Sequence, residues 1–208
     1  MLEGILRRAP HTTKFWIDET YIDYAGPAQS LEQFAARSEN VVICKSMSKV
    51  YALSGARAAY LCAGPALLEE LRSITPPWAV SLLAQVAAVR ALQDPSYYAG
   101  RYAETALLRT ELSKALAEMG LNVIDGVANF LLCHLPEDGA SAAEIVARCR
   151  EQNLFLRDAS PMGSNLGHHA LRIAVKNAAT NLQMLRILRD AMDVKNDFSQ
   201  SQPLATIA

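Results

Sequence analysis

The stretch 41-VVICKSMSKVYALSGAR-57 decides how the fold of this chain is predicted. It begins with an apolar run and changes at Lys45 into a turn rich in hydroxyl groups, which predicts a β-strand that ends at a polar loop. Residues 14–18 (KFWID) and 58–62 (AAYLC) predict two further strands on either side of it. Because helical patterns alternate with these strands, this part of the chain is predicted to be α/β, with helices packed on a largely parallel sheet.

Proline and apolar periodicity mark the helices expected around this sheet. Pro65 suits the first turn of a helix, and Pro76-Pro77 ends that helix. The next helical pattern is apolar on most faces, so it is predicted to be largely buried, and Trp16 and Trp78 are predicted to be core residues. The predicted helices are residues 31–37, 67–72 and 78–92.

The second part of the chain predicts a smaller α+β domain. Gly120 is expected to end its first helix, and Ser141 with Glu144 matches a helix-capping pair. The predicted helices are residues 97–119, 141–152 and 181–192, and the predicted strands are residues 121–124, 129–135, 154–157 and 171–175. The expected domains are residues 1–95, 96–194 and a flexible tail, 195–208.

Composition narrows the class of function. The chain has 208 residues, 51% of them hydrophobic, with 20 basic and 21 acidic side chains and a net charge of −1. Mixed charges without a basic cluster argue against a nucleic-acid partner and favour a small molecule. The apolar stretch 79–89 is interrupted by Ser81 and Gln85 and is too short to span a membrane, and no secretory signal is recognisable.

The four cysteines are Cys44, Cys62, Cys133 and Cys149, and none forms a CxxC pair. They lie in or beside apolar runs, so they are predicted to be buried free thiols in a reducing compartment. This usage favours a cytoplasmic protein.

Lys49 is the first candidate for chemistry. Ser46 and Ser48 flank it closely and Arg57 follows, so hydroxyl and guanidinium donors fit for a phosphate surround one amine. Taken alone, the segment also fits a solvated loop with an incidental lysine.

Asp18 is the second candidate, because it stands at the carboxyl end of the first strand, where open α/β sheets place their ligands. A carboxylate there needs a cationic partner if it is buried, and a protonated ring nitrogen would be one. The alternative is an aspartate that caps the following turn. His168-His169 has no spacing typical of a metal site, so no metal is predicted.

Together these segments resemble the fold-type I pyridoxal-phosphate enzymes, and among them the histidinol-phosphate aminotransferase family. The family's motifs are matched by Asp18-Glu19-Thr20-Tyr21 and by Ser46-Met47-Ser48-Lys49 with Arg57. Later landmarks are matched, in order, at residues 76–81, 128–131, 157–158 and 171–173. The resemblance implies part of an aspartate-aminotransferase-like large domain followed by the small α+β domain.

The resemblance implies roles around the cofactor, pyridoxal 5'-phosphate. Lys49 would form a Schiff base with its aldehyde and then move the Cα proton of the substrate. Asp18 would keep the pyridine nitrogen protonated, and Tyr21 would bond the phenolic oxygen. Ser46, Ser48 and Arg57 would hold the phosphate.

The resemblance also implies a grip on the substrate. Arg172 matches the arginine that binds the substrate's anionic group, and Arg157 is expected to assist it. The alternative for Arg157 is a surface ion pair with Asp158.

The implied activity moves an amino group between an amino acid, or an amino alcohol phosphate such as histidinol phosphate, and a 2-oxo acid. That reaction belongs to amino-acid metabolism, including histidine biosynthesis. The alternatives are a threonine-phosphate decarboxylase-like lyase and a truncated, non-catalytic relative. The resemblance covers the later part of the family pattern, so the chain is expected to be a fragment of a longer enzyme; the alternatives are half of a split enzyme and a degenerate relative. The full-length enzyme is expected to be a homodimer.

Overall fold

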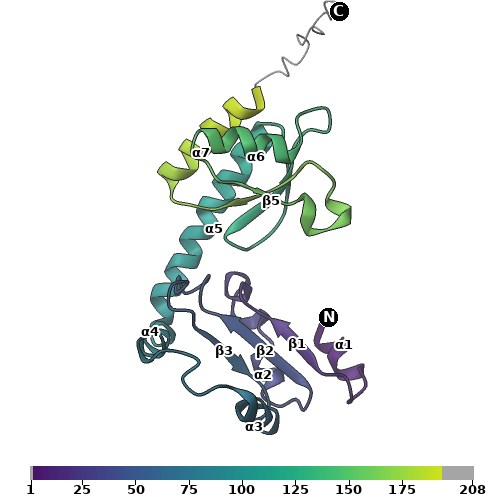
Figure 1. Cartoon of the computed structure of the whole chain (residues 1–208), viewed down its shortest axis with the longest axis vertical. Helices are drawn as coiled ribbons and strands as arrows, with labels where there is room; N and C mark the ends of the chain where they lie inside the picture. Colours follow the sequence, from purple (N-terminus) through teal and green to yellow (C-terminus); the bar gives the residue numbers. More distant parts are fainter. Residues whose placement is uncertain (1, 194–208) are drawn as a thin grey trace, which may run out of the picture. The chain divides into compact units, whose positions relative to one another are not determined.

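The computed structural model describes residues 2–193 (Figure 1), and the chain divides into two compact units between Ala106 and Leu107. Unit 1 denotes residues 2–106 and unit 2 residues 107–193. The predicted tail, residues 195–208, lies outside the described residues. Among the described residues, no helix combines the length and apolar character needed to cross a membrane.

Unit 1 contains a three-stranded sheet in the order β1 (Phe15–Asp18), β2 (Val41–Ser46), β3 (Ala59–Cys62). The three strands expected from the sequence all form. β1 is parallel to β2, whereas β3 is antiparallel to β2, so the sheet is less uniformly parallel than expected. The reason is the connection: residues 47–58 return directly as a loop, and no helix carries the chain across to a parallel position.

The helices of unit 1 follow the proline and capping signals. Pro65 opens its helix as predicted, and the Ser81 hydroxyl caps the next helix by accepting a hydrogen bond from the Ala84 N–H at 3.2 Å. The helical elements are α1 (Leu2–Arg8), η1 (Ile22–Ala25), η2 (Pro27–Gln29), α2 (Glu32–Ala35), α3 (Pro65–Ile74), α4 (Leu82–Leu92) and α5 (Pro95–Glu118), of which α5 continues into unit 2.

The prediction that residues 78–92 form a largely buried helix is wrong. The helix begins only at Leu82, and within the described chain its buried residues are Ala84 and Ala91. Leu83 is 83% exposed and Trp78 is 93% exposed. Trp16, which alternates away from the packed face of β1, is also exposed. Apolar periodicity identifies a surface that can be buried, but it does not state what covers that surface.

Unit 2 is an antiparallel sheet packed on one face by helices. The strand order is β4 (Asn122–Ile124), β5 (Phe130–His134), β7 (Ala170–Ala174), β6 (Arg157–Asp158). Its helical elements are α6 (Ala142–Glu151), η3 (Ser160–Met162), η4 (Ser164–Leu166) and α7 (Ala178–Asp193). One continuous core joins α5, α6 and α7 to β5 and β7; its fully buried side chains include Leu112, Leu116, Cys133, Ile145, Cys149, Leu171, Ile173 and Leu188.

The helix ends of unit 2 agree with the sequence signals. Gly120 adopts a φ of 87°, and the Leu121 N–H donates to the Leu116 carbonyl at 3.1 Å, which closes the end of α5. Ser141 and Glu144 form the expected capping pair. The strand predicted at residues 154–157 forms only at Arg157–Asp158.

All four cysteines are free thiols. Cys133 and Cys149 are buried, as predicted, and burial raises the pKa of these thiols to about 12 and about 11. Cys44 and Cys62 are only half-buried, which corrects the expectation for these two residues.

Candidate functional site

Asp18 lies at the carboxyl end of β1, on the face of the sheet that also carries Cys44. The two residues are register partners across the parallel pair, so their side chains lie next to each other. The Asp18 side chain is exposed, and its Oδ1 accepts hydrogen bonds from the N–H and the hydroxyl of Thr20. Burial, and then the negative charge of Asp18, raise the pKa of the Cys44 thiol. Within the described residues no donor reaches the second oxygen of Asp18.

Lys49 sits in the loop that connects β2 to β3. The loop is closed by two backbone bonds, from the Met47 N–H to the Ala58 carbonyl at 3.1 Å and from the Leu53 N–H to the Met47 carbonyl at 3.0 Å. Within the loop, the side chains of Met47 and Val50 are buried, whereas Lys49 is exposed. The buried neighbours hold the loop against the sheet and leave the lysine facing outward.

Hydroxyl and guanidinium groups gather near the same strand end. The hydroxyls of Ser46 and Ser48 lie 2.8 Å apart, and Arg57 donates from Nη1 to the Ser54 carbonyl at 2.9 Å. Arg57 precedes β3, and Ala59 is the register partner of Ser46, so Arg57 follows the loop back to this end of the sheet.

Backbone conformation in this loop is strained. Arg57 has a φ of 53° and Ala52 a φ of 55°, values that residues other than glycine rarely adopt. Such strain costs free energy and persists where the surrounding structure holds it, which is common at ligand sites.

Tyr21 lies in the segment that follows β1. It is half-buried and immediately precedes η1, where its carbonyl accepts a hydrogen bond from the Tyr24 N–H at 3.2 Å. Asp18 and Tyr21 therefore belong to one short turn at the end of β1.

Arg157 and Arg172 lie in unit 2, on neighbouring strands. They are register partners across β6 and β7, and so their side chains emerge on the same face of the sheet. The Arg172 guanidinium lies 3.9 Å from the ring centroid of Phe130. No ion pair joins Arg157 to Asp158 in the described part of the chain, and Asp158 instead accepts a hydrogen bond from the Ser160 N–H at 2.9 Å.

The structure therefore forms two groups of the predicted residues. Unit 1 brings the ends of β1, β2 and β3 together with Asp18, Tyr21, Ser46, Ser48, Lys49 and Arg57. Unit 2 pairs Arg157 with Arg172. Among residues 2–193, no group of three or more histidine, cysteine, aspartate or glutamate side chains is arranged to hold a metal ion.

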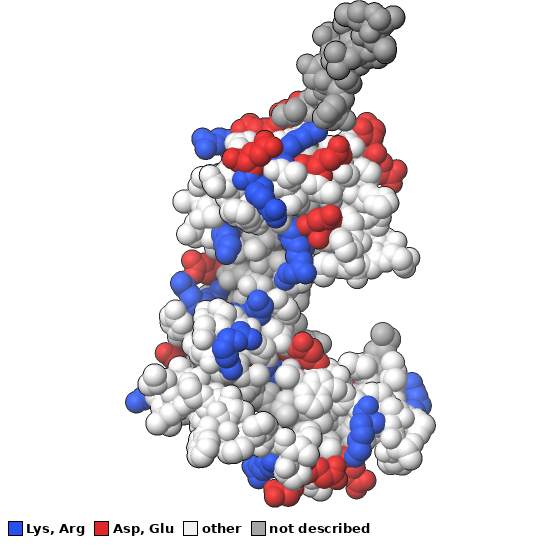
Figure 2. All heavy atoms as spheres, viewed as in Figure 1, with Lys and Arg blue, Asp and Glu red and all other residues white. Residues whose placement is uncertain are grey.

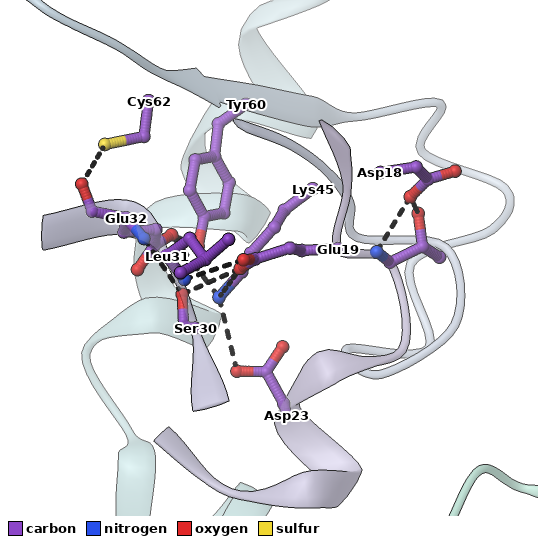
Figure 3. Close-up of polar contacts among 10 residues, drawn as sticks. Asp18, Glu19, Asp23, Ser30, Leu31, Glu32, Lys45, Tyr60 and Cys62 are labelled. Carbon is purple, nitrogen blue, oxygen red and sulfur yellow. Dashed lines mark hydrogen bonds and ion pairs between the residues drawn. The ribbon is translucent and has the colours of Figure 1, made fainter. Parts of the chain in front are cut away.

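Sequence reasoning missed a buried ionic cluster in unit 1, drawn in Figure 3. Lys45 is only 3% exposed and forms ion pairs with Glu19, Asp23 and Glu32. The signal was present, because a lysine inside an apolar strand and a glutamate directly after another strand both require partners if they are buried.

On the face of the molecule drawn in Figure 2, neither positive nor negative side chains form a patch of one sign. Figure 2 shows Lys and Arg side chains interspersed with Asp and Glu. This distribution agrees with the near-neutral composition.

Comparison with known families gives a match over nearly the whole described chain. The family described as "Aminotransferase class I and II" matches residues 2–192, which confirms the family expected from the motifs.

One curated relative and two solved structures show the extent of the similarity. Histidinol-phosphate aminotransferase of Oleidesulfovibrio alaskensis is 30% identical over 85% of this chain and 46% of its own length. The histidinol-phosphate aminotransferase of Sinorhizobium meliloti, solved with pyridoxal-5'-phosphate, has a TM-score of 0.81 at 24% identity, over 91% of this chain and 51% of that one. L-threonine-O-3-phosphate decarboxylase of Porphyromonas gingivalis has a TM-score of 0.75 at 25% identity, over 86% of this chain and 55% of that one.

These neighbours confirm the α/β fold class, and the chain spans about half the length of the curated relatives that it matches.

Proposed function

The chain belongs to the class I and II aminotransferase family, and from this membership we propose that it carries the lysine-bearing part of a pyridoxal-phosphate-dependent aminotransferase. The proposed reaction moves an amino group between an amino acid or an amino alcohol phosphate, such as histidinol phosphate, and a 2-oxo acid. The observation that carries the proposal is the outward-facing Lys49 beside the Ser46–Ser48 hydroxyl pair. These residues lie at the carboxyl end of β2, and Asp18 lies at the carboxyl end of the neighbouring strand β1.

The residues at this end of the sheet fit the cofactor. Ser46, Ser48 and Arg57 offer two hydroxyls and a guanidinium, which are the donors that a phosphate dianion requires. When bound, pyridoxal phosphate withdraws electrons from the substrate's Cα, which makes the Cα proton acidic. The S. meliloti structure, which has the same fold over this region, contains that cofactor.

Lys49 is proposed to bind the cofactor and to move the Cα proton. The buried side chains of Met47 and Val50 hold the loop in place on either side of Lys49. The Lys49 side chain itself is exposed, so its amine is accessible. A positioned amine can accept a proton from Cα and return it elsewhere, which is the proton transfer that transamination requires.

Asp18 is proposed to hold a proton at the ring nitrogen of the cofactor. Thr20 occupies only Oδ1, so the second carboxylate oxygen can accept a hydrogen bond from a protonated nitrogen. A negative charge at that position favours the protonated form. Tyr21, from the same turn, is proposed to donate to the cofactor's phenolic oxygen.

Arg157 and Arg172 are proposed to bind the anionic group of the substrate. Two guanidinium groups on register-paired positions repel each other unless an anion lies near them. A phosphate, which accepts several hydrogen bonds and carries up to two negative charges, suits such a pair. This pairing supports a phosphorylated amino substrate.

A second candidate is a decarboxylase that acts on a phosphorylated amino acid. It is favoured by the similarity to the P. gingivalis L-threonine-O-3-phosphate decarboxylase, whose name denotes a phosphorylated substrate. Arg157 and Arg172 could bind the phosphate of the substrate in either reaction. We further propose that the complete enzyme is a cytoplasmic homodimer, as the family resemblance implies.

Covalent labelling tests the proposal. The chain is mixed with pyridoxal phosphate, its visible absorption is recorded, and the complex is reduced with borohydride and mapped by mass spectrometry. We expect the label on Lys49 and its loss in Lys49→Ala. Lys114→Ala, which removes a lysine whose side chain is 80% exposed, is the matched control and should keep the label. A chain that acquires no label on Lys49 would falsify the proposal for this chain and leave the non-catalytic alternative.

Product analysis separates the two reactions. The unreduced chain with bound pyridoxal phosphate is offered amino acids, histidinol phosphate or threonine phosphate. Formation of pyridoxamine phosphate marks amino transfer, whereas release of carbon dioxide marks decarboxylation. Binding of either phosphorylated compound should weaken in Arg172→Gln.

A further inference from the structure

The buried Lys45 cluster lies outside the groups assigned to the cofactor (Figure 3). Lys45 projects from β2 on the face that also carries the buried Val41 and Ile43. Its Nζ lies 3.4 Å from Glu32 Oε1, 3.6 Å from Asp23 Oδ1 and 3.8 Å from Glu19 Oε2. One ammonium group thus lies among three carboxylates.

All three carboxylates come from the connection between β1 and β2. Glu19 follows β1 directly, Asp23 lies in η1, and Glu32 opens α2. Without the Lys45 ammonium, these carboxylates would face one another in a largely buried space, which is strongly unfavourable. Lys45 is therefore the charge that allows the whole connection to pack against β2.

Glu19 also joins the two ends of that connection. Its Oε2 accepts a hydrogen bond from the Ser30 hydroxyl at 2.7 Å, and its Oε1 accepts one from the Leu31 N–H at 2.7 Å. Glu19 is 5% exposed. A buried carboxylate held by two donors and one cation has a single well-defined position.

Tyr60 extends the network to β3. Its hydroxyl donates to Glu32 Oε1 at 2.7 Å. Burial, and then the hydrogen bond and charge of Glu32, raise the pKa of Tyr60, so the phenol remains a hydrogen-bond donor at neutral pH. The cluster consequently links the connection to both neighbouring strands.

The network reaches the cofactor residues through the polypeptide chain. Glu19 follows Asp18, and its N–H donates to the Cys44 carbonyl at 2.9 Å. Successive residues of an extended chain point to opposite faces, so fixing Glu19 on the buried face directs Asp18 to the open face. Figure 3 shows Asp18 turned away from the Lys45 cluster. Tyr21 lies two residues after Glu19 in the same turn.

We propose that Lys45 is a positioning residue of the cofactor site: through Glu19, Asp23 and Glu32 it holds residues 18–21 in the arrangement in which Asp18 and Tyr21 meet the cofactor. The inference rests on the proposed function. It assigns to Lys45 no contact with cofactor or substrate.

Two substitutions and one matched control test this role. Lys45→Met keeps the length of the side chain and removes its charge, and Lys45→Arg restores the charge. Lys14→Met makes the same chemical change at an exposed lysine of unit 1, whose Nζ donates to the Glu39 carbonyl at 3.1 Å.

The first measurement is hydrogen exchange of the cofactor-free chain. Lys45→Met should speed exchange of the amides of residues 20–31 by about tenfold or more, because the carboxylates lose their cation. Lys45→Arg and Lys14→Met should exchange as the wild type does. Equal exchange in Lys45→Met and Lys14→Met overturns the inference.

The second measurement is the pH dependence of the visible band of the cofactor bound at Lys49, which a purely structural role would leave unchanged. Lys45→Met should shift that dependence by more than about 0.5 pH unit, since Asp18 no longer has one position beside the ring nitrogen. Lys45→Arg should restore it. A band present in every variant with the same pH dependence overturns the inference, whereas a wild-type chain without any band defeats the proposed function itself.

Glu19→Gln covers the case in which Lys45→Met also loses protection throughout β2. It keeps the side chain's length and removes only one charge of the cluster. Faster exchange at residues 20–31 and a shifted band support the role of the cluster, and wild-type behaviour in both measurements overturns it.

Discussion

The two units of the chain bury their apolar side chains in different ways. Unit 2 closes one continuous apolar core around β5 and β7, whereas the buried apolar side chains of unit 1 divide into three smaller clusters. Unit 1 also buries the charged pair Glu19 and Lys45, and it leaves Trp16, Trp78 and much of α4 exposed. The difference teaches that unit 2 is organised for its own stability, while unit 1 keeps one face of its sheet open at the end where its chemical groups gather.

The largest stability effect is expected in the core of unit 2. Leu116 is fully buried, so Leu116→Ala removes packed methyl groups and should lower the free energy of unfolding of unit 2 by about 3 kcal/mol. Urea titration followed by hydrogen exchange of β5 and β7 measures it. Both tryptophans lie in unit 1, so their fluorescence reports whether that unit is unaffected.

Leu107→Ala is the matched control on the same helix. Leu107 is 69% exposed, and the same change there should alter the free energy of unfolding by no more than about 0.5 kcal/mol. Equal losses in the two variants would show that unit 2 does not depend on the core described for it.

A smaller effect is expected at the start of α6. Ser141→Ala removes the cap of this helix, since the Ser141 hydroxyl accepts from the Glu144 N–H, and should cost about 1 kcal/mol. The measurement is the urea midpoint of unit 2, and Ser113→Ala, inside α5 and away from both of its ends, is the control. A cap that contributes nothing would leave the two variants equal.

The same cap predicts a pH dependence. Hydrogen bonds from the Ser141 hydroxyl and N–H lower the pKa of Glu144 below its ordinary value of 4.5. A lowered folded-state pKa means that the stabilisation is fully present above the unfolded pKa and is lost as the pH falls through the folded pKa. The difference in unfolding midpoint between wild type and Glu144→Gln should therefore shrink below about pH 4.5. A difference that stays constant with pH would contradict this.

The smallest effect is expected on the exposed apolar surface of unit 1. Leu83 is 83% exposed in α4, so Leu83→Ser should change the free energy of unfolding of this chain by less than about 0.5 kcal/mol. Tryptophan fluorescence during urea titration is the measurement. A loss of several kcal/mol would mean that α4 is covered in solution by something outside the described chain.

Local signals predicted most of the elements. Gly120 and Ser141 mark helix ends because backbone conformation and capping depend on a few neighbouring residues. The strands of unit 1 were recognisable for the same reason, since they are short apolar runs, rich in β-branched or aromatic residues and bounded by polar residues. The predictions for α4 and the tryptophans failed because exposure depends on what packs against a residue, and no local pattern contains that information.

The candidate site also contains residues that local sequence patterns predicted and contacts that only the tertiary structure shows. Motifs around Asp18 and Lys49 were readable because both groups of residues are contiguous in sequence. The side-by-side placement of Arg157 and Arg172 depends on strand register, and the partners of Lys45 come from three separate points of the connection between β1 and β2.

The sequence by itself therefore determined the family, the cofactor-type motifs and the approximate positions of the strands and of most longer helices, because these follow from short-range patterns of residues. Only the tertiary structure decided which charges are buried together and which apolar surfaces stay open. Burial and ionic pairing are properties of residues brought together from distant parts of the chain, and Lys45 among Glu19, Asp23 and Glu32 exists only once β1, α2 and β2 have packed.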